Sequence, residues 1–581
     1  MSAVRAGSPR GEPARTTDEH DGEGFGVRTV PVLVVGGSLT GLSAAVLLAW
    51  HGVPCLLVER RDGVLPHPRL RGLLPRAMEV FRQVGLENAI RAACPDGAGS
   101  GDLVSVHART LTDVHEPLVE RGDEDPDEER GDASPETSSP CRFAPLGQDE
   151  LEALLLDRAR ELGADVAFGT ELLHLDQDDR HVTATVRGTA GEVAEVRARY
   201  VVAADGASSG LRRRLGVRSS GPGTLFHMAT LHVQADLRPA LRGRPLGMAY
   251  LDRPAPGTTL GPLDGSGTRW FFATSCRTAP GGRPYRPTPE ECAGRLRTAT
   301  GLPDLDVRLV PQTPGSDGLP STFPIGARVA DAFRVRRVLL AGDAAHQMPP
   351  TGGLGGQTAV EDVHNLAWKL ALVLNGSADP SLLDTYDAER RPVARRAVEQ
   401  SVARARSRWR LPMPDAALTT ALTTARQEDF YALVLGNQYR SPAVRGAPDD
   451  AAPLLRPSRL TGAPGSRAPH IAVAQDGGEP LSTLDLYGRD FVLLAGPDGD
   501  SWQDAASSAG RALGVAVDTY HLDEELAAPH GLPSGGALLV RPDGYVAWRC
   551  AGHRSAADAH SRLRQALRAL LGLAPAPAPS L

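Results

Sequence analysis

GDAAHQMPPTGG (Gly342–Gly353) is the stretch that decides the fold of this chain. It follows the apolar run Val338–Ala341 and leads into a segment with helical periodicity that ends near Leu374. A carboxylate on a tight turn can hold one part of a nucleotide cofactor, and a glycine-rich run entering a helix can direct backbone amides at another part. The pattern therefore predicts a cofactor site with Asp343 as one of its ligands.

A matching half lies near the start of the chain. An apolar strand, Pro31–Val35, is followed by the turn GGSLTG (36–41), a helix and a second strand that ends at Glu59. Such a turn binds pyrophosphate through its amides and the helix dipole, and the terminal acid holds a ribose. Ser38 replaces the middle glycine of the G-x-G-x-x-G pattern, which narrows the approach to the backbone. A glycine turn that only packs a helix onto a sheet is the alternative.

A third carboxylate turn follows the apolar run 200–204, which reads as a buried strand. This turn begins at Asp205-Gly206 and alone would be an ordinary strand end. The three elements occur in one order over most of the first 360 residues, and each raises the significance of the others. Together they predict an enzyme that binds FAD.

The composition excludes several classes of function. The chain has 581 residues, 41% of them hydrophobic and 4% aromatic, and a net charge of −7 with both signs interspersed. This length allows two or three domains, and the charge gives no basic surface for nucleic acid. The six cysteines form no CxxC pair and no spacing with histidine that suits zinc, so we expect reduced thiols, no metal and a cytoplasmic location. One lysine beside abundant arginine, alanine, glycine and proline resembles the codon bias of a GC-rich bacterial genome, so we expect a bacterial source.

Residues 29–50 have two properties of a membrane segment, because the stretch carries no charge and contains Gly37-xxx-Gly41. Pro31 and the Gly36-Gly37 pair break a continuous helix, and a second strand follows at once. We therefore expect a strand, turn, helix and strand, and no contact with membranes.

The pattern along the chain predicts several successive units. Short strands separated by Gly and Pro predict an inserted sheet that forms a pocket wall, and the C-terminal unit has α/β patterning without a CxxC pair. The expected division is a disordered leader (1–28), the first part of the FAD-binding domain (29–220) with an acidic disordered insertion (116–140), a substrate-binding β-sheet domain (221–330), the second part of the FAD-binding domain with helices (331–440), a linker (441–468), the C-terminal α/β domain (469–572) and a tail (573–581).

With these motifs the chain resembles the flavin-dependent aromatic hydroxylases of the p-hydroxybenzoate hydroxylase fold. Among them it is most similar to aromatic polyketide hydroxylases that carry a C-terminal thioredoxin-like domain. The resemblance covers roughly residues 30–400 by specific motifs and 460–570 by pattern only. It implies an α/β fold: a Rossmann-like FAD-binding domain with an inserted, mostly β substrate domain, followed by a thioredoxin-like domain without CxxC.

The resemblance also implies a set of FAD contacts. Glu59 would hold the adenosine ribose, the Asp205-Gly206 turn would serve both FAD and the nicotinamide donor, and Asp343 would lie on the ribityl-pyrophosphate side. Pro350 would lie near the reactive edge of the flavin, and the amides of residues 356 and 357 near its pyrimidine end. The full set of expected contacts is Gly36, Ser38, Leu39, Thr40, Gly41, Glu59, Arg60, Arg69, Gln148, Asp205, Gly206, Asp343, Pro350, Gly353, Gly355, Gly356 and Gln357.

One departure from the family pattern lies at 355–357. The sequence there is Gly-Gly-Gln, where the family usually has glycine, an apolar residue and asparagine. Backbone contacts survive this change, whereas a contact by the side chain need not. No catalytic base is named, and His227 and His346 are interpreted as structural histidines.

The resemblance implies a monooxygenase that uses FAD, NADPH (or NADH) and O₂ to hydroxylate a polycyclic phenolic or quinonoid substrate of polyketide type through a flavin hydroperoxide. Baeyer–Villiger oxygenation on the same scaffold stays an alternative, as does a non-oxygenating flavin-binding sensor or assembly protein. A dehydrogenase that uses NAD would leave Asp343 unexplained. The C-terminal unit is interpreted as structural or as an assembly surface, with a homodimer left open.

Overall fold

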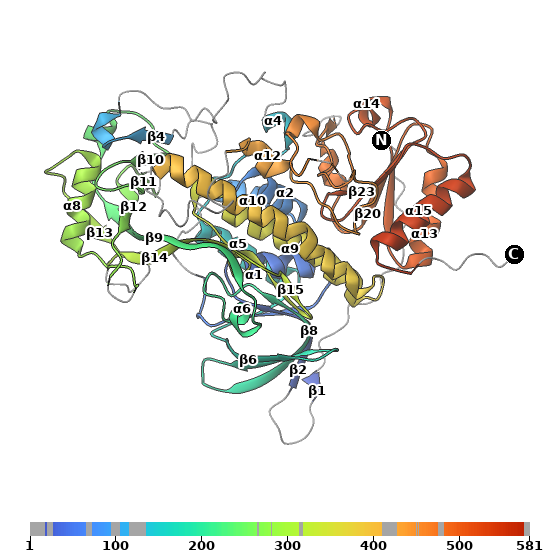
Figure 1. Cartoon of the computed structure of the whole chain (residues 1–581), viewed down its shortest axis with the longest axis horizontal. Coiled ribbons are helices and arrows are strands. Elements are labelled where there is room, and N and C mark those ends of the chain that lie inside the picture. The colour runs from blue at the N-terminus through green and yellow to red at the C-terminus, as the bar shows by residue number, and fades with distance from the viewer. Residues whose placement is uncertain are drawn as a thin grey trace.

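The computed structural model describes most of the chain, and Figure 1 shows its arrangement. The described residues are 18–19, 27–64, 72–94, 105–114, 135–263, 266–279, 282–312, 318–409, 427–448, 450, 452–473 and 481–574. The expected FAD contact Arg69, most of the leader, residues 116–134 of the insertion and most of the tail lie outside these ranges.

The core of the molecule is a parallel sheet, and the sequence predicts all of its strands except residues 165–168. In spatial order these strands are β16 (Val338–Leu340), β8 (Val193–Ala203), β2 (Val27–Val35), β3 (Cys55–Glu59) and β5 (Asp165–Phe168). Helices cover the sheet, so strands such as β3 are buried along their whole length. This burial explains why they read as uninterrupted apolar runs.

Long helices pack against this sheet and against one another. The main ones are α1 (Leu39–Trp50), α2 (Pro75–Gln83), α5 (Gln148–Glu161), α9 (Leu354–Leu374) and α10 (Asp384–Trp409). The uncharged segment 29–50 is split between β2, the glycine turn and α1, as the sequence predicts. In the part of the chain that the structure describes, no helix is both long and apolar enough to cross a membrane.

A second sheet forms the lobe drawn in green in Figure 1. Its order is β17-β14-β9-β12-β11-β10-β4, and β13 also pairs with β9. The strands are β4 (Ser105–Ala108), β9 (Ser219–Gln234), β10 (Met248–Leu251), β11 (Thr258–Pro262), β12 (Arg269–Cys276), β13 (Arg308–Val310), β14 (Ser321–Ala330) and β17 (His346–Gln347). The strand pairs of this sheet are antiparallel, except that β4 and β10 are parallel. The helix α8 (Pro289–Thr300) packs against the sheet and contributes buried side chains to the same apolar core.

The C-terminal unit is a thioredoxin-like α/β domain, drawn in orange and red in Figure 1. Its sheet has the order β21-β20-β22-β23, and only β20 and β21 are parallel. Its elements are β20 (Phe491–Ala495), α13 (Ser501–Leu513), β21 (Val517–His521), α14 (Glu524–Ala527), β22 (Ala537–Val540), β23 (Val546–Cys550) and α15 (Ala556–Leu570). We propose residues 441–468 as the segment that connects it to the FAD-binding domain.

The remaining elements are short or lie at the edges of the three sheets. They include β1 (Asp18–Glu19), which pairs with the start of β2, and β7, which pairs with both β6 and β8. The others are α3 (Glu87–Ala93), α4 (Pro135–Ser138), β6 (Glu171–Gln177), β7 (Val182–Arg187), α6 (Gly210–Arg214), α7 (Arg238–Leu241), β15 (Arg334–Val335), α12 (Phe430–Leu435), β18 (Ala472–Val473) and β19 (Leu481–Ser482).

Candidate flavin-binding site

The three predicted loops meet at one edge of the parallel sheet. Because β16, β8, β2 and β3 are neighbours and parallel, their carboxyl ends lie side by side, where this class of sheet binds ligands. Backbone hydrogen bonds tie the ends together: the amide of Gly36 donates to Val58 at 2.9 Å, and that of Ala204 donates to Val35 at 2.9 Å. The sequence prediction that distant carboxylate turns converge agrees with this geometry.

Glycines allow the loops to pack backbone against backbone. Gly36 has a φ of +110°, and a Cβ atom there would collide with the carbonyl of Ala204. Gly342 has a φ of +59°, and a Cβ atom there would collide with the side chain of Thr40. The turn at 36–41 and the turn before Asp343 are therefore fitted to each other, which requires glycine at both positions.

Glu59 ends β3 with its carboxylate folded toward the glycine turn. The residue is 6% exposed, and its Oε2 accepts a hydrogen bond of 2.7 Å from the amide of Gly37. Oε1 accepts bonds from the amide and the Nε of Arg61. Burial opposes ionisation, but the hydrogen bonds from Arg61 and Gly37 outweigh it and lower the pKa of Glu59 below its usual value. The neighbouring Arg60 is exposed at the same edge.

A carboxylate that the sequence analysis missed holds the start of α1. Glu152 is 1% exposed, and its Oε1 accepts hydrogen bonds from the Ser38 hydroxyl at 2.5 Å and the Leu39 amide at 2.9 Å. Gln148 donates to the same oxygen at 2.6 Å and to Ser38 at 3.0 Å. The Ser38 hydroxyl therefore has partners within the protein. The signal was the spacing of four residues between 148 and 152, which puts both side chains on one helix face.

Two features of this edge fit a bound dinucleotide. Among the described residues, no protein acceptor meets the amide N–H groups of Thr40 and Gly41, which open α1. Asp205 Oδ2 accepts the amide of Leu211 at 3.0 Å, whereas its buried Oδ1 meets no hydrogen-bond partner in the described part of the chain. Helix-opening amides suit a pyrophosphate, and an unpartnered buried carboxylate oxygen suits a ligand hydroxyl. Gly206, beside it, has a φ of +78°.

The turn that carries Asp343 is held from beneath by α9. The side chain of Asp343 is exposed, whereas the amide of Gly342 donates to Asp362 Oδ2 at 3.1 Å. The same oxygen contacts His346 Nε2 at 2.8 Å. Burial would raise the pKa of Asp362, but the charges of His346 and Arg390 outweigh it and lower that pKa. His346 is thus a buried support of the turn. His227, the other histidine that the sequence analysis interprets as structural, contacts Thr278 Oγ1 at 3.0 Å.

The glycine run turns sharply before α9 begins. Pro350 is exposed, and Gly352 and Gly353 have φ values of +83° and +66°. The hydroxyl of Thr351 donates to the carbonyl of Ser401 at 2.6 Å, which anchors the run to α10. Gly355 and Gly356 follow as partly exposed residues in the first turn of α9.

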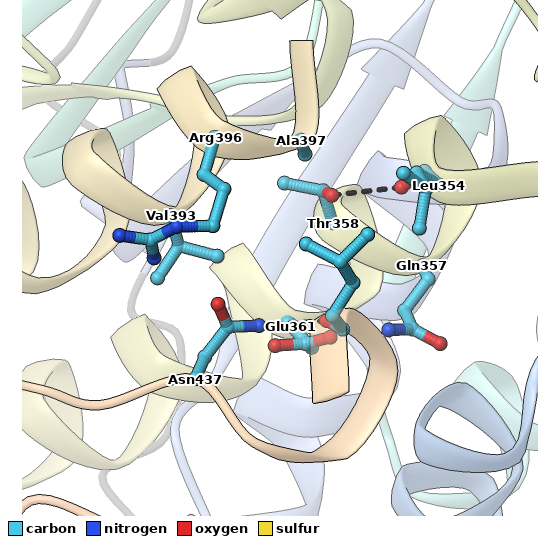
Figure 2. Close-up of a pocket in the computed structure, with 9 residues that line it drawn as sticks. Leu354, Gln357, Thr358, Glu361, Val393, Arg396, Ala397 and Asn437 are labelled. Carbon is cyan, nitrogen blue, oxygen red and sulfur yellow. Dashed lines mark hydrogen bonds between the residues drawn. The ribbon is translucent and has the colours of Figure 1, made fainter. Parts of the chain in front are cut away.

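Gln357 lies in the same turn of α9, but its side chain is buried at a cavity between α9, α10 and α12 (Figure 2). Its Nε2 donates to the carbonyl of Val434 at 3.2 Å. Its Oε1 has no partner among the described residues. A flavin contact by this residue would therefore use its backbone N–H group and not its side chain. Such a contact is compatible with the departure from the family pattern at 355–357.

This arrangement defines a class of protein: an FAD-binding protein with a Rossmann-like sheet. The comparisons agree, because residues 29–401 match the FAD binding domain and residues 461–574 match the aromatic-ring hydroxylase C-terminal domain. The chain belongs to the family of FAD-dependent aromatic-ring hydroxylases.

Individual relatives support this assignment. The chain is 39% identical to the tetracenomycin A2 monooxygenase-dioxygenase of Streptomyces glaucescens, over 93% of this chain and 97% of the relative. It is 37% identical to the 4-methyl-5-nitrocatechol 5-monooxygenase of a Burkholderia species, over 93% and 97%. A solved aklavinone-11 hydroxylase in complex with FAD and aklavinone is 38% identical, with a TM-score of 0.81 over 94% of this chain and 99% of the other.

Proposed function

We propose that this protein is an FAD-dependent monooxygenase that hydroxylates a polycyclic phenolic or quinonoid substrate, with NADPH or NADH as the reductant. The observation that carries the proposal is the meeting of three carboxylate turns at one sheet edge, in a family of aromatic-ring hydroxylases. FAD, when bound, accepts a hydride from the nicotinamide and activates O₂.

The residues of this edge would hold and orient the cofactor. The amides of Thr40 and Gly41 would face the pyrophosphate, and Glu59 would take the adenosine ribose. Asp205 would accept a hydroxyl through its unpartnered Oδ1. The first turn of α9, with Gly355 and Gly356, would place the positive end of the helix dipole near the pyrimidine end of the flavin, where negative charge develops on reduction.

An apolar cluster on the inserted sheet supports a large, flat substrate. It lies between the sheet and the last turns of α10, and its aromatic members suit stacking with fused rings. The cluster consists of Met228, Ala273, Ile325, Ala405 and Trp409, with Phe226, Tyr250 and Phe271 packed against it.

The position of this cluster relative to the flavin loops follows from α10. Ser401 of this helix accepts the hydroxyl of Thr351, and Trp409 lies eight residues further on. At about 1.5 Å per residue, the aromatic wall stands roughly 12 Å along the helix from the glycine run. Phe226 and Trp409 meet edge to face, with 5.6 Å between ring centroids.

The test is a flavin absorbance spectrum combined with NADPH consumption over a panel of phenols. The panel contains tetracyclic quinones and a nitrocatechol, because the names of the relatives include tetracenomycin A2 and aklavinone as well as 4-methyl-5-nitrocatechol. We expect NADPH oxidation that a polycyclic phenol stimulates, and a hydroxylated product that carries one atom of labelled O₂. A lactone or ring-opened product would establish the Baeyer–Villiger alternative. A yellow protein without stimulated oxidation would favour the non-oxygenating one.

We propose a bacterial cytoplasmic location, because the reduced nicotinamide donor is a metabolite of that compartment. A homodimer stays an option, and light scattering of the purified protein decides it.

A further inference from the structure

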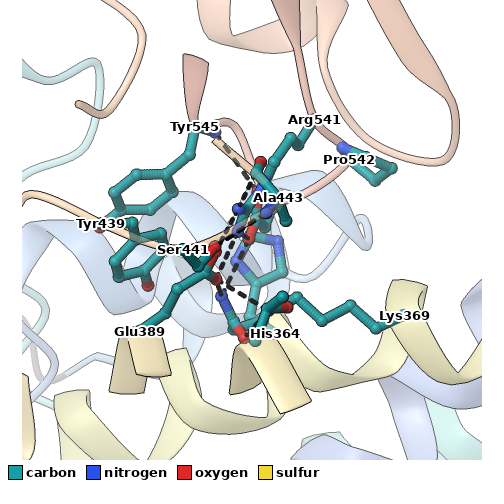
Figure 3. A network of polar contacts seen from close by, with 12 residues as sticks. His364, Lys369, Glu389, Tyr439, Ser441, Ala443, Arg541, Pro542 and Tyr545 are labelled. Atoms are coloured by element: carbon teal, nitrogen blue, oxygen red, sulfur yellow. Dashed lines mark hydrogen bonds and ion pairs between the residues drawn. The ribbon is translucent and has the colours of Figure 1, made fainter. Parts of the chain in front are cut away.

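Glu389 of α10 is buried at the junction with the C-terminal domain (Figure 3). Its Oε1 accepts hydrogen bonds from Arg541 Nη1 and from the Ser441 hydroxyl, each at 2.6 Å. Its Oε2 accepts bonds from Arg541 Nη2 at 2.9 Å, Lys369 Nζ at 2.8 Å and Asn365 Nδ2 at 2.6 Å. A carboxylate with five donors is fixed in position, and so is the part of α10 that carries it.

The strongest of these partners comes from the other domain. Arg541 follows β22, is 1% exposed and grips Glu389 through both Nη atoms. Its guanidinium is also bonded to Asp543 and lies 5.1 Å from the ring centroid of Trp368 and 5.3 Å from that of Tyr439. This bidentate geometry orients the carboxylate as well as neutralising it.

The next residue along α10 faces the flavin side. Arg390 is fully buried, and its Nε donates to Asp362 Oδ1 at 2.9 Å. The other oxygen of Asp362 accepts the amide of Gly342, the residue before Asp343. Consecutive residues of α10 therefore connect the C-terminal domain with the turn that is expected to hold FAD.

We propose that the C-terminal domain positions the flavin turn through a chain of contacts from Arg541 to Glu389, and from Arg390 to Asp362 and the amide of Gly342. This inference rests on the proposed FAD site. Arg541 and Asp362 act in it as positioning residues, because neither is expected to touch the cofactor. The competing explanation is that Arg541 only fastens two domains together, as the more exposed Arg82–Asp485 ion pair does at the same interface.

A double-mutant cycle on FAD binding tests the proposal. Apo-protein of the wild type, Arg541→Lys, Asp362→Asn and the double variant is titrated with FAD, with flavin fluorescence and the absorbance spectrum of the complex as readouts. Arg541→Lys keeps the positive charge but removes the bidentate grip. We expect each single variant to raise the Kd for FAD by about fivefold or more. In the double variant the Kd should stay within about twofold of that of Asp362→Asn, because both changes break one route.

Asp485→Asn is the matched control, since it breaks an ion pair between the same two domains away from α10. Its Kd for FAD should stay within about twofold of the wild-type value. If Arg541→Lys does not fold, Asp543→Asn takes its place in the cycle, because it weakens the hold on the Arg541 guanidinium that contacts Glu389.

Two results would overturn the proposal: an unchanged Kd in Arg541→Lys, or effects that multiply in the double variant. Multiplied effects would show that Arg541 and Asp362 act independently. If the wild-type apo-protein itself fails to bind FAD, the proposed function fails instead.

Discussion

The carboxylate of Glu59 accepts a hydrogen bond of 2.7 Å from the amide of Gly37, which ties the end of β3 to the turn that opens α1. A Cβ atom on Gly37 would collide with the Glu59 side chain, so the two residues are fitted to each other. Glu59 therefore has two tasks: it shapes the glycine turn and stands ready for a ribose.

Replacing Glu59 separates these tasks. Glu59→Ala loses the acceptor and the shape of the turn, so we expect the Kd for FAD to rise by about 10-fold to 100-fold. Glu59→Gln keeps an acceptor for the Gly37 amide and should raise the Kd for FAD less than Glu59→Ala does. Fluorescence titration of the apo-proteins measures both, and equal values for Glu59→Ala and the wild type would contradict the assignment.

Asp343→Ala should reduce FAD retention strongly and leave the apo-protein folded. The side chain is exposed on its turn, so its removal leaves no buried cavity. Two measurements are needed: the flavin-to-protein absorbance ratio after purification, and the melting temperature of the apo-protein. A variant that purifies with full flavin would argue against Asp343 as a ligand.

Gly342→Ala should damage both the fold and the site. Its φ of +59° disfavours a side chain by about 1–2 kcal/mol, and the new methyl group would also collide with Thr40. We expect a lower free energy of unfolding in urea and weaker FAD binding. Gly376→Ala is a useful comparison, because Gly376 has a φ of +82° but open space around its Cβ position. If the two variants behave alike, backbone strain alone explains the loss.

Lys369 should make stability depend on pH in an unusual window. Burial lowers its pKa from 10.5 to about 8, although Glu389 opposes that shift. Between these values the unfolded chain holds a proton that the folded chain has released, so the free energy of unfolding should rise with pH. The slope from this group is at most about 1.4 kcal/mol per pH unit.

Urea unfolding of the wild type and Lys369→Met across this window measures the effect. The free energy of unfolding of the wild type minus that of Lys369→Met should increase as the pH rises. A constant difference would show that Lys369 keeps its proton in the folded state.

The local patterns of the FAD-binding half were sufficient to predict β2, α1, β3 and β16, whereas β5 and β6 were not predicted. The apolar runs that became β2, β3 and β16 are each followed by a glycine or a carboxylate, and this order is visible without a structure. The match to FAD-dependent aromatic-ring hydroxylases confirms the predicted family and fold class. The roles of individual contact residues stay predictions.

The supports of the site were not predicted, for a physical reason. Charged residues in helices such as α9 and α10 are usually solvated, so Asp362 and Glu389 read as surface positions. Their burial depends on partners that lie far away in sequence, and Arg541 is 152 residues from Glu389. Glu152 is the exception, because its spacing from Gln148 was a usable signal.

The chain contains a single lysine, and its side chain is fully enclosed in the network of Figure 3. Reagents that acylate amines should therefore modify the folded protein at its α-amino group only. A dye, a biotin or a solid support attached by this chemistry would be joined to the chain at one position. Acylation of Lys369 itself, detected by mass spectrometry, would report that this buried network had opened.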